Sequence, residues 1–264
     1  MGAQALTRQT GNWYKCHGFL QVSGNHPVSP HPVSNTPFLL IPGLNSTPEV
    51  FRHLVPALWP YGPVTVANHT EGDGIAGIAA GILRDAPPRF ALLGFSLGGY
   101  LAFEMVRQAP GRVVKLCLLD TTARPDTPEA TAKRQERIAI VRNGGFSKTL
   151  DGAFEDAVHP DHQGRAELRA LSKAMSLAVG AETYIRHQEA IMARADSRPT
   201  LASIRVPTAV VVGDSDKITP PEMAREMADR IAGATLTVVE RAGHLAVLEQ
   251  PEAVNGAIVA WAKG

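Results

Sequence analysis

Three side chains in this sequence, Ser96, Asp216 and His244, are of the types that nucleophilic catalysis by a serine requires. A serine hydroxyl is a weak nucleophile at neutral pH, so it needs a base to accept its proton and a group that holds the base in the correct tautomer. Histidine suits the role of base because it titrates near neutrality, and a carboxylate suits the third role. The combination predicts acyl transfer to water through a Ser-His-Asp triad.

Ser96 lies in the sequence Gly94-Phe95-Ser96-Leu97-Gly98, between an apolar run at residues 90–93 and a helical pattern at residues 97–108. The continuous apolar run is typical of a parallel strand buried on both faces. A strand that turns into a helix with almost no loop strains the corner residue, and flanking glycines allow the two elements to approach. We therefore expect the Ser96 hydroxyl at the top of a sheet, over a helix N-terminus whose amides can stabilise an oxyanion.

His244 is the only one of nine histidines that directly follows a predicted strand near the C-terminal end of the chain. For the acid, Asp120, Asp214 and Asp216 all lie at strand ends, and Asp216 lies a few residues beyond the strand at residues 208–212. Asp214 follows that strand too closely to turn easily toward the histidine. Asp120, directly after the strand at residues 113–119, remains an alternative acid. Asp214 and Asp120 have a structural reading as well, in which they accept hydrogen bonds from turn amides.

Strands and helices alternate from residue 38 onward. Strands are expected at residues 38–41, 64–67, 90–93, 113–119, 208–212 and 235–239, and helices at 48–58, 75–84, 97–108 and 253–262. Thr219 and Glu222 are spaced as a capping box, which predicts a further helix start with Pro220 in its first position. This alternation indicates a parallel sheet, in which functional sites gather at the carboxyl ends of the strands.

The serine motif, the acid loop and the final Gly243-His244 together resemble the α/β-hydrolase fold superfamily, and within it serine-nucleophile, carboxylesterase-like bacterial hydrolases. The resemblance covers about residues 38 to 262. It favours Asp216 as the acid, because Gly213-Asp214-Ser215-Asp216 matches the family's Gly-x-x-Asp placement before a proline and a helix, and the chain order Ser96, Asp216, His244 is the one this family has. It implies a mostly parallel central sheet with helices on both faces and an inserted helical cap. It also implies that the backbone amides of Leu44 and Leu97 form the oxyanion hole, although Pro42 replaces the histidine usual before Gly43. No metal or organic cofactor is implied.

Three parts are expected from the pattern. Residues 1–37 form an N-terminal extension or linker, residues 38–122 and 205–264 form the hydrolase core, and residues 123–204 form the helical cap. Within the cap the periodicity predicts helices at residues 132–141, 166–177 and 181–193. A cap of this sort excludes water and shapes specificity.

The function implied by the resemblance is hydrolysis of a small or medium uncharged carboxylic ester, lactone or thioester through an acyl-enzyme. Carbon–carbon bond hydrolases and cofactor-free perhydrolases share the triad and stay open as alternatives. So does a ligand receptor built on the same fold without turnover. The serine at position 96, in the turn from strand to helix, argues against dehalogenases and epoxide hydrolases, which resemble this fold but carry aspartate as the nucleophile there.

The composition limits the kinds of partner that we expect for this protein. With 26 basic and 25 acidic residues, the net charge of +1 favours neither nucleic acid nor an acidic membrane surface as a partner. No apolar run approaches the roughly 18 residues that span a bilayer, and no secretory h-region is evident in the first thirty residues. Cys16 and Cys117 form no disulfide framework or zinc pattern, so a reducing cytoplasm fits best. Oligomeric state is not predicted.

For seven other histidines, solvated or structural roles are favoured. A solvated loop is favoured for His17, His26 and His31, a solvated turn for His69 with Glu71 and Asp73, a polar loop for His159 and His162, and a surface or packing role for His187. Substrate contact near His69, and metal binding at the loop histidines His17, His26, His31, His159 and His162, are the weaker alternatives.

Overall fold

The computed structural model describes residues 36–264, so nearly all of the expected N-terminal extension, including Cys16, His17, His26 and His31, lies outside the described residues. A six-stranded sheet runs through this part of the chain in the order β2-β1-β3-β4-β5-β6, and all neighbouring strands are parallel. Its strands are β1 (Phe38–Ile41), β2 (Val64–Val66), β3 (Phe90–Phe95), β4 (Val113–Leu119), β5 (Thr208–Gly213) and β6 (Thr235–Val239).

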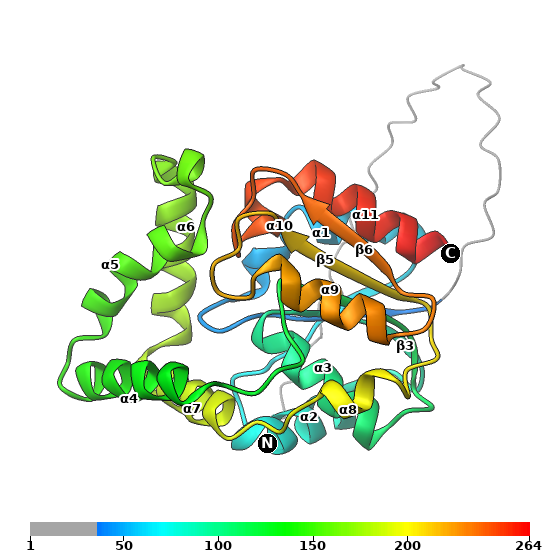
Figure 1. Ribbon diagram of the computed structural model, residues 1–264, viewed down its shortest axis with the longest axis horizontal. Coiled ribbons are helices and arrows are strands. Elements are labelled where there is room, and N and C mark those ends of the chain that lie inside the picture. The colour runs from blue at the N-terminus through cyan, green and yellow to red at the C-terminus, as the bar shows by residue number, and fades with distance from the viewer. Residues whose placement is uncertain (1–35) are drawn as a thin grey trace, which may run out of the picture. The chain divides into compact units, whose positions relative to one another are not determined.

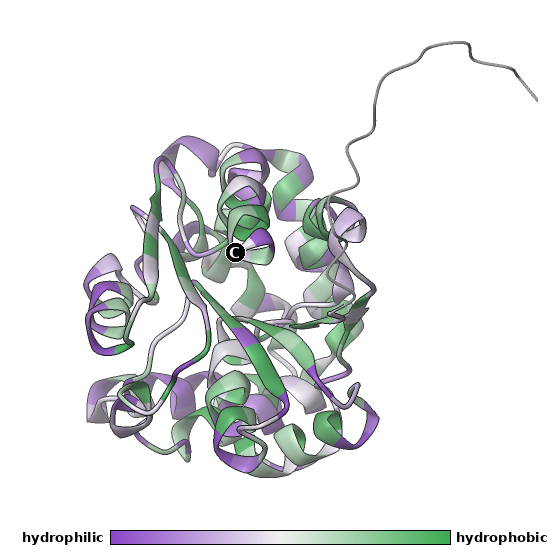
Figure 2. Cartoon of the chain, turned by 90° about the vertical axis from the view of Figure 1, so that its right-hand side faces the viewer, coloured by the Kyte–Doolittle hydropathy of each residue, from purple (hydrophilic) through white to green (hydrophobic). Residues whose placement is uncertain are grey.

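Helices cover both faces of the sheet (Figure 1). Those that belong to the alternating core are α1 (Leu54–Leu58), α2 (Gly74–Asp85), α3 (Leu97–Gln108), α9 (Pro221–Arg230), α10 (Ala246–Glu249) and α11 (Pro251–Lys263). Successive strand residues point to opposite faces, so Leu92 belongs to a hydrophobic cluster that includes residues of α2, α3 and α9, while Leu93 belongs to a second cluster with residues of α1, α10 and α11. Figure 2 shows the resulting hydrophobic strands between helices whose outer sides are polar. The predicted α/β fold class is confirmed.

Two expectations for the core need correction. The strand at 64–67 was expected to be buried, but Val64, Thr65 and Val66 are half-buried or exposed because β2 lies at the edge of the sheet. The expected helix at 48–58 is divided into a 3₁₀ helix (Pro48–Phe51) and α1. Pro56 has no N–H and its ring clashes with the carbonyl of residue i−4, so α1 begins only two residues before it.

A helical insertion separates β4 from β5. It consists of α4 (Pro128–Arg142), α5 (Phe146–Ala157), a 3₁₀ helix (Pro160–His162), α6 (Ala166–Val179), α7 (Ala181–Met192) and α8 (Arg198–Leu201). Figure 1 shows α4, α5 and α6 to the left of the sheet. The sequence analysis found α4, α6 and α7 but missed α5, in which Phe146, Leu150 and Phe154 recur every four residues, interrupted by Gly152.

Within the described residues, no helix has both the length and the apolar composition needed to cross a bilayer. Cys117 is a fully buried free cysteine on the apolar strand β4. Burial raises the pKa of its thiol, which disfavours the reactive thiolate.

Candidate active site

Ser96 forms the corner between β3 and α3. Its backbone has φ 53° and ψ −115°, a strained conformation for a residue with a side chain. A Cβ on Gly94 would lie 2.3 Å from the carbonyl oxygen of Gly98, and one on Gly98 would lie 2.1 Å from that of Ile41. Glycine is therefore required at both positions for strand and helix to meet, which is the geometry the motif predicted.

The structure brings Ser96, His244 and Asp216 into one chain of hydrogen bonds. Ser96 Oγ lies 2.8 Å from His244 Nε2, and His244 Nδ1 lies 2.8 Å from Asp216 Oδ2. The carboxylate accepts the Nδ1–H, so Nε2 is the lone-pair nitrogen that faces the hydroxyl. The segments that supply these residues follow β3, β5 and β6 and meet at the carboxyl edge of the sheet. Asp216 and His244 are 3% and 6% exposed, which places the pair in a low-dielectric environment.

Three further hydrogen-bond donors hold the carboxylate of Asp216 in place. Its Oδ1 accepts the backbone N–H groups of Ile218 at 2.8 Å and Thr219 at 2.9 Å, and its Oδ2 accepts the Thr219 hydroxyl at 2.7 Å. The predicted Thr219–Glu222 capping box is thus wrong, because α9 has no side-chain cap and the hydroxyl turns to the carboxylate instead. Burial alone would raise the pKa of Asp216, but the imidazole of His244 and these hydrogen bonds outweigh it and hold the pKa below its usual value.

The other two carboxylates at strand ends have different partners. Asp214 accepts the backbone N–H groups of Arg241 at 2.9 Å and Ala242 at 3.3 Å, as its turn-stabilising reading predicted. Asp120 Oδ1 accepts the N–H of Gly213 at 2.9 Å, and its Oδ2 has no hydrogen-bond partner among the described residues. Burial, with the nearby charge of Asp216, raises the Asp120 pKa well above its usual value. The carboxylate hydrogen-bonded to His244 is that of Asp216.

A buried glutamate that sequence reasoning missed supports the histidine loop. Glu249, on α10, is 3% exposed, and its Oε1 accepts the N–H of Gly243 at 2.8 Å. Its Oε2 accepts the backbone N–H of His159 at 2.7 Å and lies 2.9 Å from Nδ1 of His162. Glu249 therefore ties the residue preceding His244 to the insertion. No local pattern could have indicated this, because a glutamate near a helix end is ordinarily solvated.

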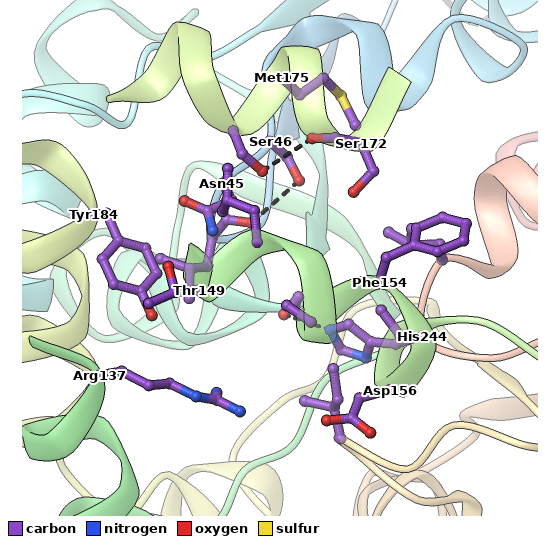
Figure 3. Close-up of a pocket in the computed structure, with 18 of the residues that line it drawn as sticks. Asn45, Ser46, Arg137, Thr149, Phe154, Asp156, Ser172, Met175, Tyr184 and His244 are labelled. Atoms are coloured by element: carbon purple, nitrogen blue, oxygen red, sulfur yellow. Dashed lines mark hydrogen bonds between the residues drawn. The ribbon is translucent and has the colours of Figure 1, made fainter. Parts of the chain in front are cut away.

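A cavity of about 260 Å³ opens over Ser96 and His244. The core contributes Leu44, Asn45 and Ser46 to its wall, and α4 to α7 contribute the opposite side, including Phe154, Met175 and Tyr184. Figure 3 shows the labelled side chains of this lining around His244, among them Asn45, Ser46, Phe154, Met175 and Tyr184. Arg137 and Asp156 also line the cavity. Leu97 is the first residue of α3, so its N–H has no partner within the helix. Leu44 follows β1 in the turn that lines the cavity.

Two histidines interpreted as solvated or peripheral are buried beside the Leu44 turn. His69 is 2% exposed and His187 is 1% exposed, and their rings stack with centroids 5.0 Å apart. The interpretation of His69 as part of a solvated turn is therefore wrong, because α7 of the insertion packs over that segment. For His187, the packing role that the sequence allowed is confirmed.

A model of the alpha/beta hydrolase family matches residues 38–257, and the chain belongs to this family. Pimeloyl-acyl-carrier protein methyl ester esterase of Neisseria meningitidis serogroup B is 30% identical over 231 residues, which cover 81% of this chain and 88% of that protein. Polyketide synthase ThaQ of Burkholderia thailandensis is 32% identical over 241 residues, which are 84% of this chain but 12% of the synthase.

Among solved structures, a thermophilic esterase from Thermogutta terrifontis superposes with a TM-score of 0.78 at 28% identity, covering 86% of this chain and 89% of that one. The chain is therefore an enzyme of the esterase type, as the serine motif and its context predicted. The arrangement of Ser96, His244 and Asp216 described above has the form of a hydrolase triad.

Proposed function

We propose that this enzyme hydrolyses a carboxylic ester, with lactones and thioesters as chemically equivalent substrates, by a two-step acyl-enzyme mechanism at Ser96. The observation that carries the proposal is the continuous hydrogen-bond chain from Ser96 Oγ through His244 to Asp216, at the base of a cavity. The identity with an esterase over most of both chains supports ester cleavage as the reaction.

In the first step His244 Nε2 accepts the proton of Ser96 Oγ while Oγ bonds to the carbonyl carbon of the substrate. Asp216 stabilises the imidazolium that forms. The carbonyl oxygen becomes an oxyanion and accepts hydrogen bonds from the backbone N–H groups of Leu44 and Leu97. When the carbon–oxygen bond to the alcohol breaks, His244 returns the proton to the leaving oxygen. Water then repeats the sequence on the acyl-enzyme and releases the carboxylic acid.

We also propose that residues 123–204 act as the cap over this site and that the remaining described residues form the catalytic core. The cavity walls support this division, because Ser96 and His244 come from the core while α4 to α7 supply the opposite wall. Such a wall excludes water from the reacting atoms and sets the length of acyl chain that fits.

The charge of this wall bears on the substrate. The insertion contributes Arg134, Arg137, Arg169 and Lys173 to the cavity lining, against the single carboxylate of Asp156. Arg134 is paired with Asp126 at 2.6 Å, and Arg169 with Glu155 at 2.7 Å. Arg137, which makes no ion pair or hydrogen bond among the described residues, favours an ester that carries an anionic group at a distance from the reacting carbonyl.

The test follows hydrolysis of a series of chromogenic acyl esters of increasing length by the wild type, by Ser96→Ala and by Ser203→Ala. Ser203 is a matched control, because its hydroxyl bonds to the Thr200 carbonyl in the turn after α8, outside the cavity lining. We expect Ser96→Ala to lose activity on the order of 10⁴-fold or more, and Ser203→Ala to keep it. A wild type that is inert across the series, or a Ser96→Ala variant that keeps its rate, contradicts the proposal.

A further inference from the structure

The buried pair of His69 and His187 joins the insertion to the Leu44 turn. His69 follows β2 in the chain, and His187 lies on α7, which packs against α2. Their ring planes are inclined by only 26°, so the two imidazoles form a stacked contact in the interior. Neither ring takes part in the hydrogen-bond chain at Ser96, and their burial therefore calls for another explanation.

Each ring donates a hydrogen bond to a backbone carbonyl. His69 Nε2 lies 3.0 Å from the carbonyl oxygen of Gly43, and His187 Nε2 lies 2.8 Å from that of His69. A carbonyl oxygen only accepts, so both Nε2 atoms carry hydrogen. The neighbouring Arg186 donates to the carbonyl of Thr70 at 2.8 Å, so α7 binds two consecutive peptides of the segment that presents His69.

The carbonyl that His69 binds belongs to the same peptide unit as the N–H of Leu44. A peptide is planar and trans, so its C=O and its N–H point in opposite directions and cannot turn independently. The N–H of Ser46 also donates to Gly43 O, at 3.2 Å. The two donors, His69 Nε2 and Ser46 N–H, hold the carbonyl edge of this peptide, and they thereby determine where the Leu44 N–H points at the opposite edge. They also polarise the peptide and strengthen that N–H as a donor.

The same peptide is packed tightly against the nucleophile. A Cβ on Gly43 would lie 2.9 Å from the ring of Phe95 and 3.1 Å from Cβ of Ser96. Asn45 and Ser46 of this turn line the same cavity as Tyr184 of α7 and His244 (Figure 3). A small rotation of the Gly43–Leu44 peptide would therefore move the Leu44 N–H relative to the carbon that Ser96 attacks.

We propose that His69 is a positioning residue that orients the Gly43–Leu44 peptide for oxyanion stabilisation, and that α7 holds His69 in place through His187 and Arg186. The inference rests on the proposed function, in particular on Leu44 as an oxyanion donor. Burial, with the charge of His187, lowers the pKa of His69 to about 4 although the Gly43 carbonyl opposes this. His69 is therefore a neutral Nε2–H donor at the pH where esterases work.

The test compares His69→Gln with His69→Met, two side chains of similar length of which only glutamine supplies an N–H donor. We expect kcat of His69→Met to fall about 10- to 100-fold with KM within about twofold, because loss of a whole oxyanion donor costs about 10²–10³ in kcat. His69→Gln should recover kcat to within about threefold of the wild type. Affinity for a trifluoromethyl ketone, which forms an oxyanion on the serine, should fall in parallel with kcat. Wild-type kcat in His69→Met, or equal losses in both variants, overturns the proposal.

A second variant tests the link to the insertion and covers the case in which His69→Met does not fold. His187→Phe keeps the stacked ring and loses the N–H that binds the His69 carbonyl. We expect a smaller fall in kcat, of about three- to tenfold, again without a change in KM, and a folded variant with wild-type kcat contradicts the link.

Ser96→Ala, measured beside these variants, separates the two levels of inference. If Ser96→Ala keeps its activity, the proposed function fails. If Ser96→Ala is inactive while the His69 variants match the wild type, only the positioning role fails.

Discussion

The hydroxyl of Thr219 gives the sharpest test of how the acid is held. It donates to Asp216 Oδ2, the oxygen that also binds His244, and it lies 3.4 Å from His244 Nδ1. Thr219→Val removes this donor and keeps the shape of a side chain that is 1% exposed. The carboxylate then loses part of the stabilisation that keeps it ionised and aimed at the imidazole.

The size of the effect follows from the contacts that remain. A hydrogen bond to a charged group contributes about 1.5–3 kcal/mol, and about 1.4 kcal/mol corresponds to tenfold in rate. The backbone N–H groups of Ile218 and Thr219 still bind Oδ1, so the carboxylate stays in place and the lower part of that range applies. We expect kcat of Thr219→Val to fall about tenfold, with KM within about twofold.

The assay is steady-state hydrolysis of a chromogenic ester by Thr219→Val and by Thr219→Ser, which keeps the hydroxyl and serves as the control. Thermal unfolding of both variants shows whether the fold is intact. A folded Thr219→Val enzyme with wild-type kcat would refute the reasoning, and so would an equal loss in Thr219→Ser, since packing rather than the hydroxyl would then be responsible.

Three further outcomes are expected. Asp216→Asn should lower kcat for ester hydrolysis on the order of 10⁴-fold, because the amide favours the wrong tautomer of the base. Asp120→Asn replaces a carboxyl whose pKa is raised, so its kcat should stay within about threefold of the wild type. The reverse pattern would make Asp120 the acid. The folded-state pKa of His69 lies below its unfolded value, so the unfolded chain binds the proton first and stability is lost as pH falls from 6.5 to about 4. Over that window the free energy of unfolding should fall by about 3 kcal/mol through His69, and denaturant titrations of His69→Gln should show a correspondingly shallower pH dependence. Arg137→Gln should raise KM for an ester with a terminal carboxylate more than for the neutral ester of equal length, and an equal change for both would exclude a charge effect.

The sequence allowed the site to be anticipated where short-range pattern determines position. Ser96 is positioned by glycines two residues away on either side, and His244 by the end of a strand, so the sequence alone predicts that both lie at the carboxyl edge of the sheet. The resemblance to the family favours Asp216 over Asp120, and the structure gives the physical reason. Asp120 follows β4 directly and its carboxyl turns to Gly213, while Asp216 stands three residues beyond β5 and reaches the imidazole.

Residues whose partners are distant in the chain could not be anticipated. Glu249 binds His159 and His162, which precede it by 90 and 87 residues, and nothing near Glu249 in the sequence encodes that contact. His69 is separated from its partner His187 by 118 residues. In the sequence only its polar neighbours bear on its environment, and they indicate a solvated turn. Thr219 fitted a local capping pattern, but the buried charge of Asp216 competes for the same hydroxyl and wins.

The place of the insertion has a consequence for how this enzyme can diversify. Leu116 of β4 and Thr208 of β5 are partners in the sheet although the whole insertion separates them. The entropy of closing a loop grows only with the logarithm of its length, about 0.6 kcal/mol for each doubling. Folding of the sheet is therefore nearly indifferent to the length of the segment between these strands. Insertions, deletions and substitutions between these strands can therefore change the cavity wall without opening the sheet, provided that the contacts of His159, His162 and His187 with the core are kept.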